Sequence, residues 1–522
     1  MRFLIRNLPR LSYQTSFLVK TAVLLIALGF GAGMLSYSLD DDAQFRSALY
    51  FDGLNFESPL LDLANTIDDT THEPEDFAHY LQFLTNRAQL YVIDDNFMQG
   101  IEETKYPPDQ KQIARLLAQS LKANSASPEL LALSNQTPPA PYSNFALAQL
   151  WEMQGFGRDA GRAYEAEALI TGDNDTRQLA IDAYLNKSAF RELVRLLDDP
   201  NYSHLLVNER SYLEYQRAVI ERDWPQIVLS TVVLQYDDLV WQIVLITLLT
   251  GAAWYVFLIH AGSLWPQPKN LAICAFAILL GMMSAMSTLL AITVQEDYLG
   301  FTEKYDLIGG LLYCIAGIGL REELLKLLFF MPMLPILLRK KDPLLALVVA
   351  GCVGLGFAVE ENLSYLHQSD GMSGPARFLT ANFLHISATA LTGYALYRAF
   401  LTKWRELDYF ASMFGLIVFA HGLYDAFLML PNLMEFSIFS MTIYVLMCYQ
   451  MFQIMEQIRP HGHRRVSLSF VFTASLSAVL AVSLGWSTAQ IGMDGLRALG
   501  VSVVAVGVIV IMFFRVINEP IR

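Results

Sequence analysis

Residues 343–366 read PLLALVVAGCVGLGFAVEENLSYL, and this apolar stretch decides the fold class. A helix needs about 20 predominantly apolar residues to cross the hydrocarbon core of a bilayer, and this run is long enough. It nevertheless carries two adjacent carboxylates, Glu360 and Glu361, near its end. Because a charged side chain costs at least ~2.5 kcal/mol inside a membrane, such residues predict a functional site.

Other apolar runs of similar length occupy much of the chain, in which 54% of the residues are hydrophobic. Helices satisfy every backbone hydrogen bond within one segment, so we predict an all-α, polytopic membrane protein. The four cysteines all fall inside the predicted spans, so no disulfide framework is expected. The ten predicted membrane-spanning helices lie at about 17–39, 239–260, 270–294, 307–331, 343–366, 376–400, 409–430, 435–457, 467–489 and 495–515.

Charge is distributed unevenly along the chain. The formal net charge is −14, but residues 40–238 alone hold 33 acidic and 15 basic residues, a net charge of −18, and the remainder is net +4. This composition excludes nucleic acid as a partner, because the phosphates would be repelled. We therefore divide the chain into a cytoplasmic N-terminus with the first membrane helix (1–39), an acidic soluble helical domain (40–238) and a nine-helix membrane domain (239–522).

The basic residues predict the orientation in the lipid bilayer. They cluster before the first span and in alternate loops, which the positive-inside rule places in the cytoplasm. Both termini are then cytoplasmic and residues 40–238 are extracytoplasmic, as in a multi-pass protein of a bacterial inner membrane. The first run lacks a small-x-small cleavage site, which favours an uncleaved signal anchor over a signal peptide. The basic clusters are Arg2 to Lys20, Arg339–Lys341, Arg398–Arg405 and Arg459–Arg465.

Residues 144–236 show a helical periodicity of about 32–35 residues, with units that begin near Asn144, Leu179 and Tyr212. This spacing favours repeats of tetratricopeptide type. Such repeats stack into a concave surface, which would hold a peptide or protein ligand. An ordinary helical domain with chance periodicity is the alternative.

Four consecutive predicted spans hold nearly all the deeply placed ionisable residues. In the span at 307–331, Glu322 and Lys326 lie four residues apart and share a helix face. Their attraction lowers the cost of burying both, and Glu323 lies beside them. A salt bridge at a helix end is the structural alternative for this motif.

In the following span, Phe357 and Glu361 lie one helical turn apart. Gly354 and Gly356 permit close contact with a neighbouring helix. Glu360 points about 100° away from Glu361 around the helix, which makes it the weaker candidate for a site residue.

The next two spans each carry one deeply placed histidine, His385 and His421. A packing histidine is the structural alternative for His385. Because His421 and Asp425 are again four residues apart, Asp425 either fixes the imidazole tautomer or shares a metal or a water with it. Counted from the predicted span ends, these side chains and Glu361 lie within about 15 Å of the extracytoplasmic face.

Carboxylates beside imidazoles in a water-limited site are suited to hydrolysis. A carboxylate takes a proton from water while a histidine or a cation stabilises the oxyanion. Alternatively, Glu and His side chains hold a divalent metal such as zinc, which activates the water. The candidate metal ligands are Glu322, Glu361, His385, His421 and Asp425.

Three motifs on these spans resemble the signature of the PrsW-type intramembrane proteases, which are related to CAAX-prenyl endopeptidases and bacteriocin-processing proteases. The motifs Glu-Glu-x-x-Lys, Phe-x-x-x-Glu and His-x-x-x-Asp stand here as Glu322–Lys326, Phe357–Glu361 and His421–Asp425. His385 matches a histidine that the family tends to carry on the intervening helix. The resemblance covers about residues 270–460.

This resemblance implies an intramembrane endopeptidase that cleaves a membrane-anchored protein, such as an anti-sigma factor, on the extracytoplasmic side. We favour Glu322 as the general base, with His385 and His421 on the oxyanion or the scissile carbonyl. A proton-coupled transporter and a catalytically silent scaffold with a peptide-binding repeat domain are the rival hypotheses. The expected catalytic residues are Glu322, Glu323, Glu361, His385, His421 and Asp425, supported by Lys326, Phe357 and Asn362.

Overall fold

The structure is a computed structural model that describes residues 2–40, 76–237, 239–304, 306–368, 374–460 and 466–521. Within these ranges every regular element is a helix and no β-strand occurs, which confirms the predicted all-α class. The chain divides into two compact units. One consists of Met1–Leu54 together with Gln235–Arg522, and the other is Asn55–Leu234.

The unit Asn55–Leu234 is built from short helices. Four of them begin with an Asp or Ser whose side chain accepts a hydrogen bond from a first-turn N–H, which supplies a missing helical partner. Its helices are α5 (Phe77–Leu90), α6 (Asp95–Glu103), α7 (Pro108–Ala123), α8 (Pro128–Ser134), α9 (Ser143–Met153), α10 (Gly157–Thr171), α11 (Asn174–Leu185), α12 (Phe190–Leu197) and α13 (Arg210–Glu221), and α14 (Trp224–Tyr236) ends beyond it.

Consecutive helices from α9 to α13 pack against one another. Their lengths are uneven, from 8 residues in α12 to 15 in α10. A regular repeat requires equivalent helices at equivalent positions, so the predicted tetratricopeptide architecture is not confirmed.

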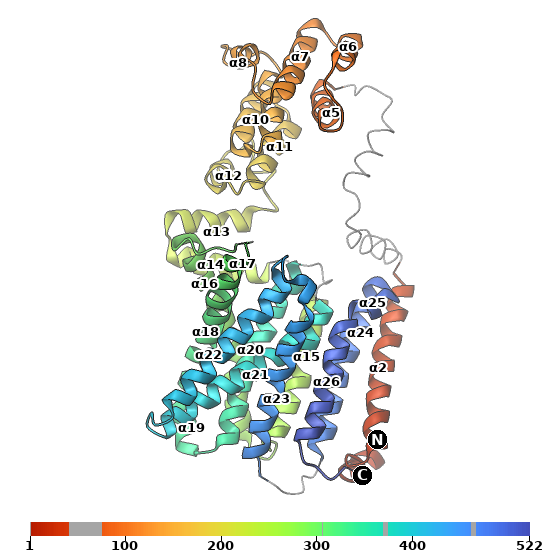
Figure 1. The fold of residues 1–522 in the computed structure, drawn as a ribbon, viewed down its shortest axis with the longest axis vertical. Helices are drawn as coiled ribbons and strands as arrows, with labels where there is room; N and C mark the ends of the chain where they lie inside the picture. The colour runs from red at the N-terminus through yellow and green to blue at the C-terminus, as the bar shows by residue number, and fades with distance from the viewer. Residues whose placement is uncertain are drawn as a thin grey trace. The chain divides into compact units, whose positions relative to one another are not determined.

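The other unit is a bundle of long apolar helices that lie side by side, with the N- and C-termini at the same end (Figure 1). Its elements are α1 (Arg2–Leu11), α2 (Thr15–Ser38), α15 (Trp241–Ala261), α16 (Pro268–Thr293), η1 (Val294–Tyr298), α17 (Leu307–Leu312), η2 (Tyr313–Gly319), α18 (Leu320–Phe330), η3 (Met331–Met333), α19 (Leu334–Lys340), α20 (Pro343–Gln368), α21 (Gly374–Leu401), α22 (Leu407–Met429), η4 (Met434–Phe436), α23 (Ile438–Ile458), α24 (Leu468–Ile491), α25 (Asp494–Ala498) and α26 (Gly500–Val516).

Within the described ranges, seven helices are long and apolar enough to cross a membrane, namely α2, α15, α16 with η1, α20, α22, α23 and α24. The protein is therefore multi-pass, but the predicted count of ten spans is not confirmed. The segment at 307–340 is broken by π- and 3-10 turns and carries charges, and α26 has only 17 residues. Helix α21 is long, but buried Asn, His, Ser and Thr side chains lower its hydropathy.

Helix α20 is the centre of the bundle, where it packs against α15, α16 and α21. A Cβ on Gly354 would lie 2.2 Å from the carbonyl oxygen of His385, and one on Gly356 would lie 2.0 Å from that of Ile278. Both distances are far below van der Waals contact. The prediction that these glycines permit close helix packing is thus confirmed.

The predicted span at 307–331 is not one regular helix. Helix α17 continues through the π-helical turn η2 into α18. Where η2 crosses α22, a Cβ on Gly422 would lie 2.4 Å from Cα of Ile315. Inserted π-turns occur frequently at functional sites, and η2 ends directly before the stretch that contains Glu322, Glu323 and Lys326.

Candidate active site

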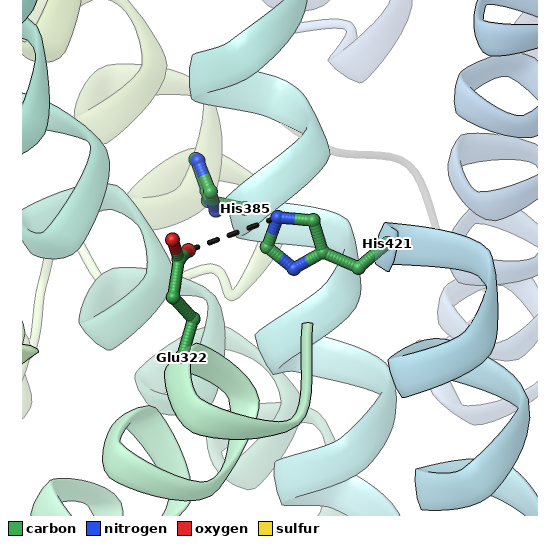
Figure 2. A group of neighbouring side chains, drawn as sticks. All are labelled: Glu322, His385 and His421. Atoms are coloured by element: carbon green, nitrogen blue, oxygen red, sulfur yellow. Dashed lines mark ion pairs between the residues drawn. The ribbon is translucent and has the colours of Figure 1, made fainter. Parts of the chain in front are cut away.

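Four helices of the bundle bring the predicted site residues together. Figure 2 shows Glu322 on α18, His385 on α21 and His421 on α22 pointing toward one another. Helix α20 adds Glu361, whose carboxylate contacts His385. Of the predicted catalytic residues, all six therefore lie in one cluster or in direct contact with it.

Lys326 is the cationic centre of the cluster, and its side chain is fully buried. Its Nζ lies 3.2 Å from Oε2 of Glu322 and 2.9 Å from Oε1 of Glu323. The ammonium also lies 3.9 Å from the centre of the Phe357 ring, a cation–π contact. These contacts bring Lys326 against both carboxylates and the Phe357 ring, and the ammonium compensates the charge of the carboxylates.

His385 is held on both sides of its ring. Its Nε2 lies 2.8 Å from Oε2 of Glu361, and its Nδ1 lies 2.8 Å from Nζ of Lys326. The ammonium can only donate, so Nδ1 is the acceptor and Nε2–H donates to Glu361. This geometry fits a neutral imidazole in a single tautomer.

His421 is held from one side only. Its Nδ1 lies 2.8 Å from Oε1 of Glu323, whereas its Nε2 lies 3.7 Å from Oε2 of Glu322 and 3.5 Å from Oδ2 of Asp425. The last two separations exceed a good hydrogen bond. Asp425 is thus near the ring nitrogen that faces Glu322, while Glu323 fixes the other one. The sequence did not identify Glu323 as the partner of His421, because 98 residues separate them.

Two polar residues of α20 lie apart from this cluster. Glu360 is buried and accepts hydrogen bonds from Nε2 of Gln235 at 3.2 Å and from the hydroxyl of Tyr236 at 2.6 Å. Asn362 donates to Oδ1 of Asn382 on α21 at 2.7 Å. Asn382 was not singled out from the sequence. An amide within an apolar run, one helical turn before His385, was the signal that could have identified it. Glu360 and Asn362 therefore connect helices rather than contact the imidazoles.

The side chains of Glu322, His385 and His421 form a group that could hold a metal ion. One ligand atom from each lies within 4.8 Å of the others, and all three residues are buried. One carboxylate with two imidazoles is a set that zinc takes in hydrolases. Glu361 contacts Nε2 of His385, and Glu323 contacts Nδ1 of His421. In metal sites, a carboxylate on the ring nitrogen that does not bind the metal orients the histidine. The donor set therefore fits a divalent metal.

Lys326 competes with a metal for this group. The lone pair of His385 Nδ1 that would bind a metal accepts a hydrogen bond from the lysine ammonium. A metal ligand set that includes His385 requires this hydrogen bond to open. The second carboxylate oxygen of Glu323 is buried without a hydrogen-bond partner in the described part of the chain, so an acceptor for the displaced ammonium lies next to it.

All four cysteines, Cys274, Cys314, Cys352 and Cys448, are buried as free thiols, as expected for apolar packing residues.

The fold and the site together define a multi-pass helical membrane protein with a buried carboxylate–imidazole centre. The model of the PrsW family intramembrane metalloproteases matches residues 268–453, which include every helix that contributes to this centre. This part of the chain is a PrsW-type intramembrane protease domain, and the protein is therefore a protease. No curated protein and no solved structure matches the chain.

Proposed function

We propose that this protein is a metal-dependent intramembrane endopeptidase that cleaves a single-pass membrane protein, such as an anti-sigma factor, near the extracytoplasmic side. The observation that supports the proposal is the buried convergence of Glu322, His385 and His421. The family match favours this function over the transporter and scaffold hypotheses.

In this proposal, the metal ligands are a carboxylate oxygen of Glu322, Nδ1 of His385 and Nε2 of His421. A bound divalent metal supplies the Lewis acidity that activates water and polarises the scissile carbonyl. Glu361 and Glu323 keep the two imidazoles neutral in the required tautomers by accepting from the other ring nitrogens. These two carboxylates therefore act as positioning residues.

Asp425 is the carboxylate best placed to accept the proton of the attacking water. Its Oδ2 lies 3.5 Å from Nε2 of His421, and its side chain is 19% exposed, although Oδ2 itself is buried. In this proposal Asp425 is neither a ligand nor the acceptor of an imidazole N–H, which leaves it the role of proton acceptor. In this assignment Glu322 is a ligand, and the general base is Asp425 rather than Glu322.

Lys326 has an electrostatic role in this proposal. Four carboxylates near the imidazoles would repel one another in a medium of low dielectric, and the ammonium offsets part of their charge. It remains close enough to the cluster to stabilise negative charge on the scissile carbonyl oxygen.

Cleavage of candidate single-pass membrane proteins tests the proposal. Cells that produce wild type or Glu322→Gln at equal levels are compared by immunoblot, and we expect a fragment only with wild type. Glu360→Gln is the matched control, because it neutralises a buried glutamate outside the cluster and should leave cleavage intact. Equal processing by wild type and Glu322→Gln would rule out a role for Glu322 in the chemistry.

A further inference from the structure

Two adjoining cavities form a groove on the unit Asn55–Leu234. The larger has a volume of about 480 Å³ and the smaller about 220 Å³. Both are lined by Gln82 of α5 and Leu179 of α11, so they adjoin. Helix α9 contributes to both, through Gln149 and Phe145. We call this feature the carboxamide groove.

Four of the eight residues that line the larger cavity carry side-chain amides. Gln82, Asn86 and Gln89 follow one face of α5 and have no hydrogen-bond partner among the described residues. Each carboxamide offers both a donor and an acceptor, as does every peptide unit of an extended chain. From Gln82 to Gln89 the helix rises about 10 Å, which is the length of about three residues of an extended strand. The row thus matches the backbone of an extended polypeptide in chemistry and in length.

One amide in this groove is held rigidly. Gln149 is only 6% exposed, and its Nε2 donates to the hydroxyl of Tyr164 at 2.5 Å. That hydroxyl donates in turn to Glu152 at 2.9 Å. The oxygen of Gln149 accepts no hydrogen bond from the described residues, and Gln149 lines the larger cavity. A backbone N–H of a ligand in the cavity could therefore donate to this oxygen.

The smaller cavity makes one end of the groove acidic. It is lined by Asp76 at the start of α5 and by Asp173 and Asp175 at the start of α11. Asp76 and Asp173 cap their helices, whereas the exposed Asp175 lies within the first turn. His79 also lines this cavity, and its Nδ1 lies 2.9 Å from Oδ2 of Asp76. With Asp173 and Asp175 this end still carries an excess of carboxylates, which attracts a cationic side chain.

We propose that the carboxamide groove binds an extended polypeptide segment that carries Lys or Arg at the end near Asp76, Asp173 and Asp175. The amides of α5 and α9 pair with the ligand backbone and are indifferent to its sequence. The aspartates select the positive charge and set the direction of the segment. This binding is independent of the chemistry at Glu322.

Fluorescence anisotropy with the purified full chain in detergent tests this site. The protein carries Glu322→Gln, so that binding is measured without cleavage. The probes are a fluorescein-labelled ten-residue peptide of alternating serine and lysine and a matched serine–glutamate peptide. We expect the lysine peptide to bind and the glutamate peptide not to bind.

Variants of the groove separate specific binding from general attraction to an acidic protein. Asn86→Ala/Gln89→Ala should weaken binding of the lysine peptide about tenfold, because two backbone hydrogen-bond pairs are lost. Asp175→Asn should weaken it a few-fold and reduce its dependence on salt. Gln112→Ala, on the exposed face of α7 away from the groove, should bind as the parent does.

Three outcomes would overturn the proposal. They are no binding of the lysine peptide, equal affinity of the parent and Asn86→Ala/Gln89→Ala, and equal binding of the two peptides. The substituted side chains are exposed and polar, so thermal unfolding midpoints should not change. Because the parent already lacks Glu322, failure of the proposed protease mechanism leaves these results unaffected.

Discussion

Two clusters of buried charges in the membrane unit differ in how their charges are satisfied. In the C-terminal cluster, Glu519 accepts hydrogen bonds from the hydroxyl of Ser467 at 2.7 Å and from the backbone N–H groups of Leu468 and Ser469 at 2.9 Å each. Arg459 lies 3.9 Å from the same carboxylate. Glu519 thereby supplies acceptors to the first turn of α24, where backbone N–H groups lack helical partners.

In the active-site cluster, the contacts are mostly between side chains of different helices. Nε2 of His421 faces two carboxylates beyond hydrogen-bond distance, and one oxygen of Glu323 is buried without a partner in the described ranges. In the first cluster both oxygens of Glu519 accept hydrogen bonds, and these bonds connect the chain terminus to a helix. The second leaves ligand atoms directed at a common point, which is the arrangement that metal binding and proton transfer require.

Removal of a proposed metal ligand from the active-site cluster is expected to have the largest effect on activity. His421→Ala should lose the bound metal and reduce cleavage to background, because one of three ligand atoms is gone. Metal content by mass spectrometry and cleavage of a membrane-anchored substrate are the measurements. Glu519→Gln, in the C-terminal cluster, is the control and should retain both the bound metal and the cleavage activity. A metal-free wild type with full activity would instead favour direct activation of water by a glutamate.

Loss of the central cation is expected to have the largest effect on stability. Lys326→Met should lower the free energy of unfolding by about 3–5 kcal/mol, because Glu322 and Glu323 remain buried without their counter-charge. Denaturant unfolding in detergent micelles measures this change. Lys340→Met removes an exposed lysine at the end of α19 and should unfold as wild type does. A Lys326→Met protein as stable as wild type would show that the carboxylates are protonated.

Two adjacent glutamates offer a sharper comparison within one helix. Glu361→Gln should reduce activity about 10–100-fold, because His385 loses the charged acceptor that orients it. Glu360→Gln should remain within a few-fold of wild type, since an amide oxygen can still accept from Gln235 and Tyr236. The measurement is the initial cleavage rate of each variant at matched protein concentration. Similar losses in both variants would contradict the separation of their roles.

The smallest effect on catalysis is expected in the C-terminal cluster. Glu519→Gln should lower stability by about 1–3 kcal/mol, because charged hydrogen bonds to the start of α24 are replaced by neutral ones. Cleavage rates at a temperature well below unfolding should not change. The measurement is a thermal unfolding midpoint alongside the rate. A selective loss of rate with unchanged stability would place this cluster in the functional machinery.

Hydropathy does not identify two of the four helices that carry the site, α18 and α21. Apolar runs identified seven spans that the structure confirms by length and composition. The stretches that contain Glu322 and His385 fall outside that set. Turns divide the first into short helices, and polar side chains lower the hydropathy of the second. Their identification relied on the motifs and on helical spacing, which place residues three and four apart on one face.

The sequence by itself determined the helical class, the multi-pass character and the local pairs within one helix. Glu322 and Lys326 contact because they are four residues apart on α18. Only the tertiary structure decided which partners meet across helices. The pairing of His421 with Glu323 and the separation of Glu360 from Glu361 depend on how each helix is rotated about its axis. That rotation is set by close contacts at Gly354, Gly356 and Gly422 and by the π-turn η2, and helical periodicity alone does not specify it.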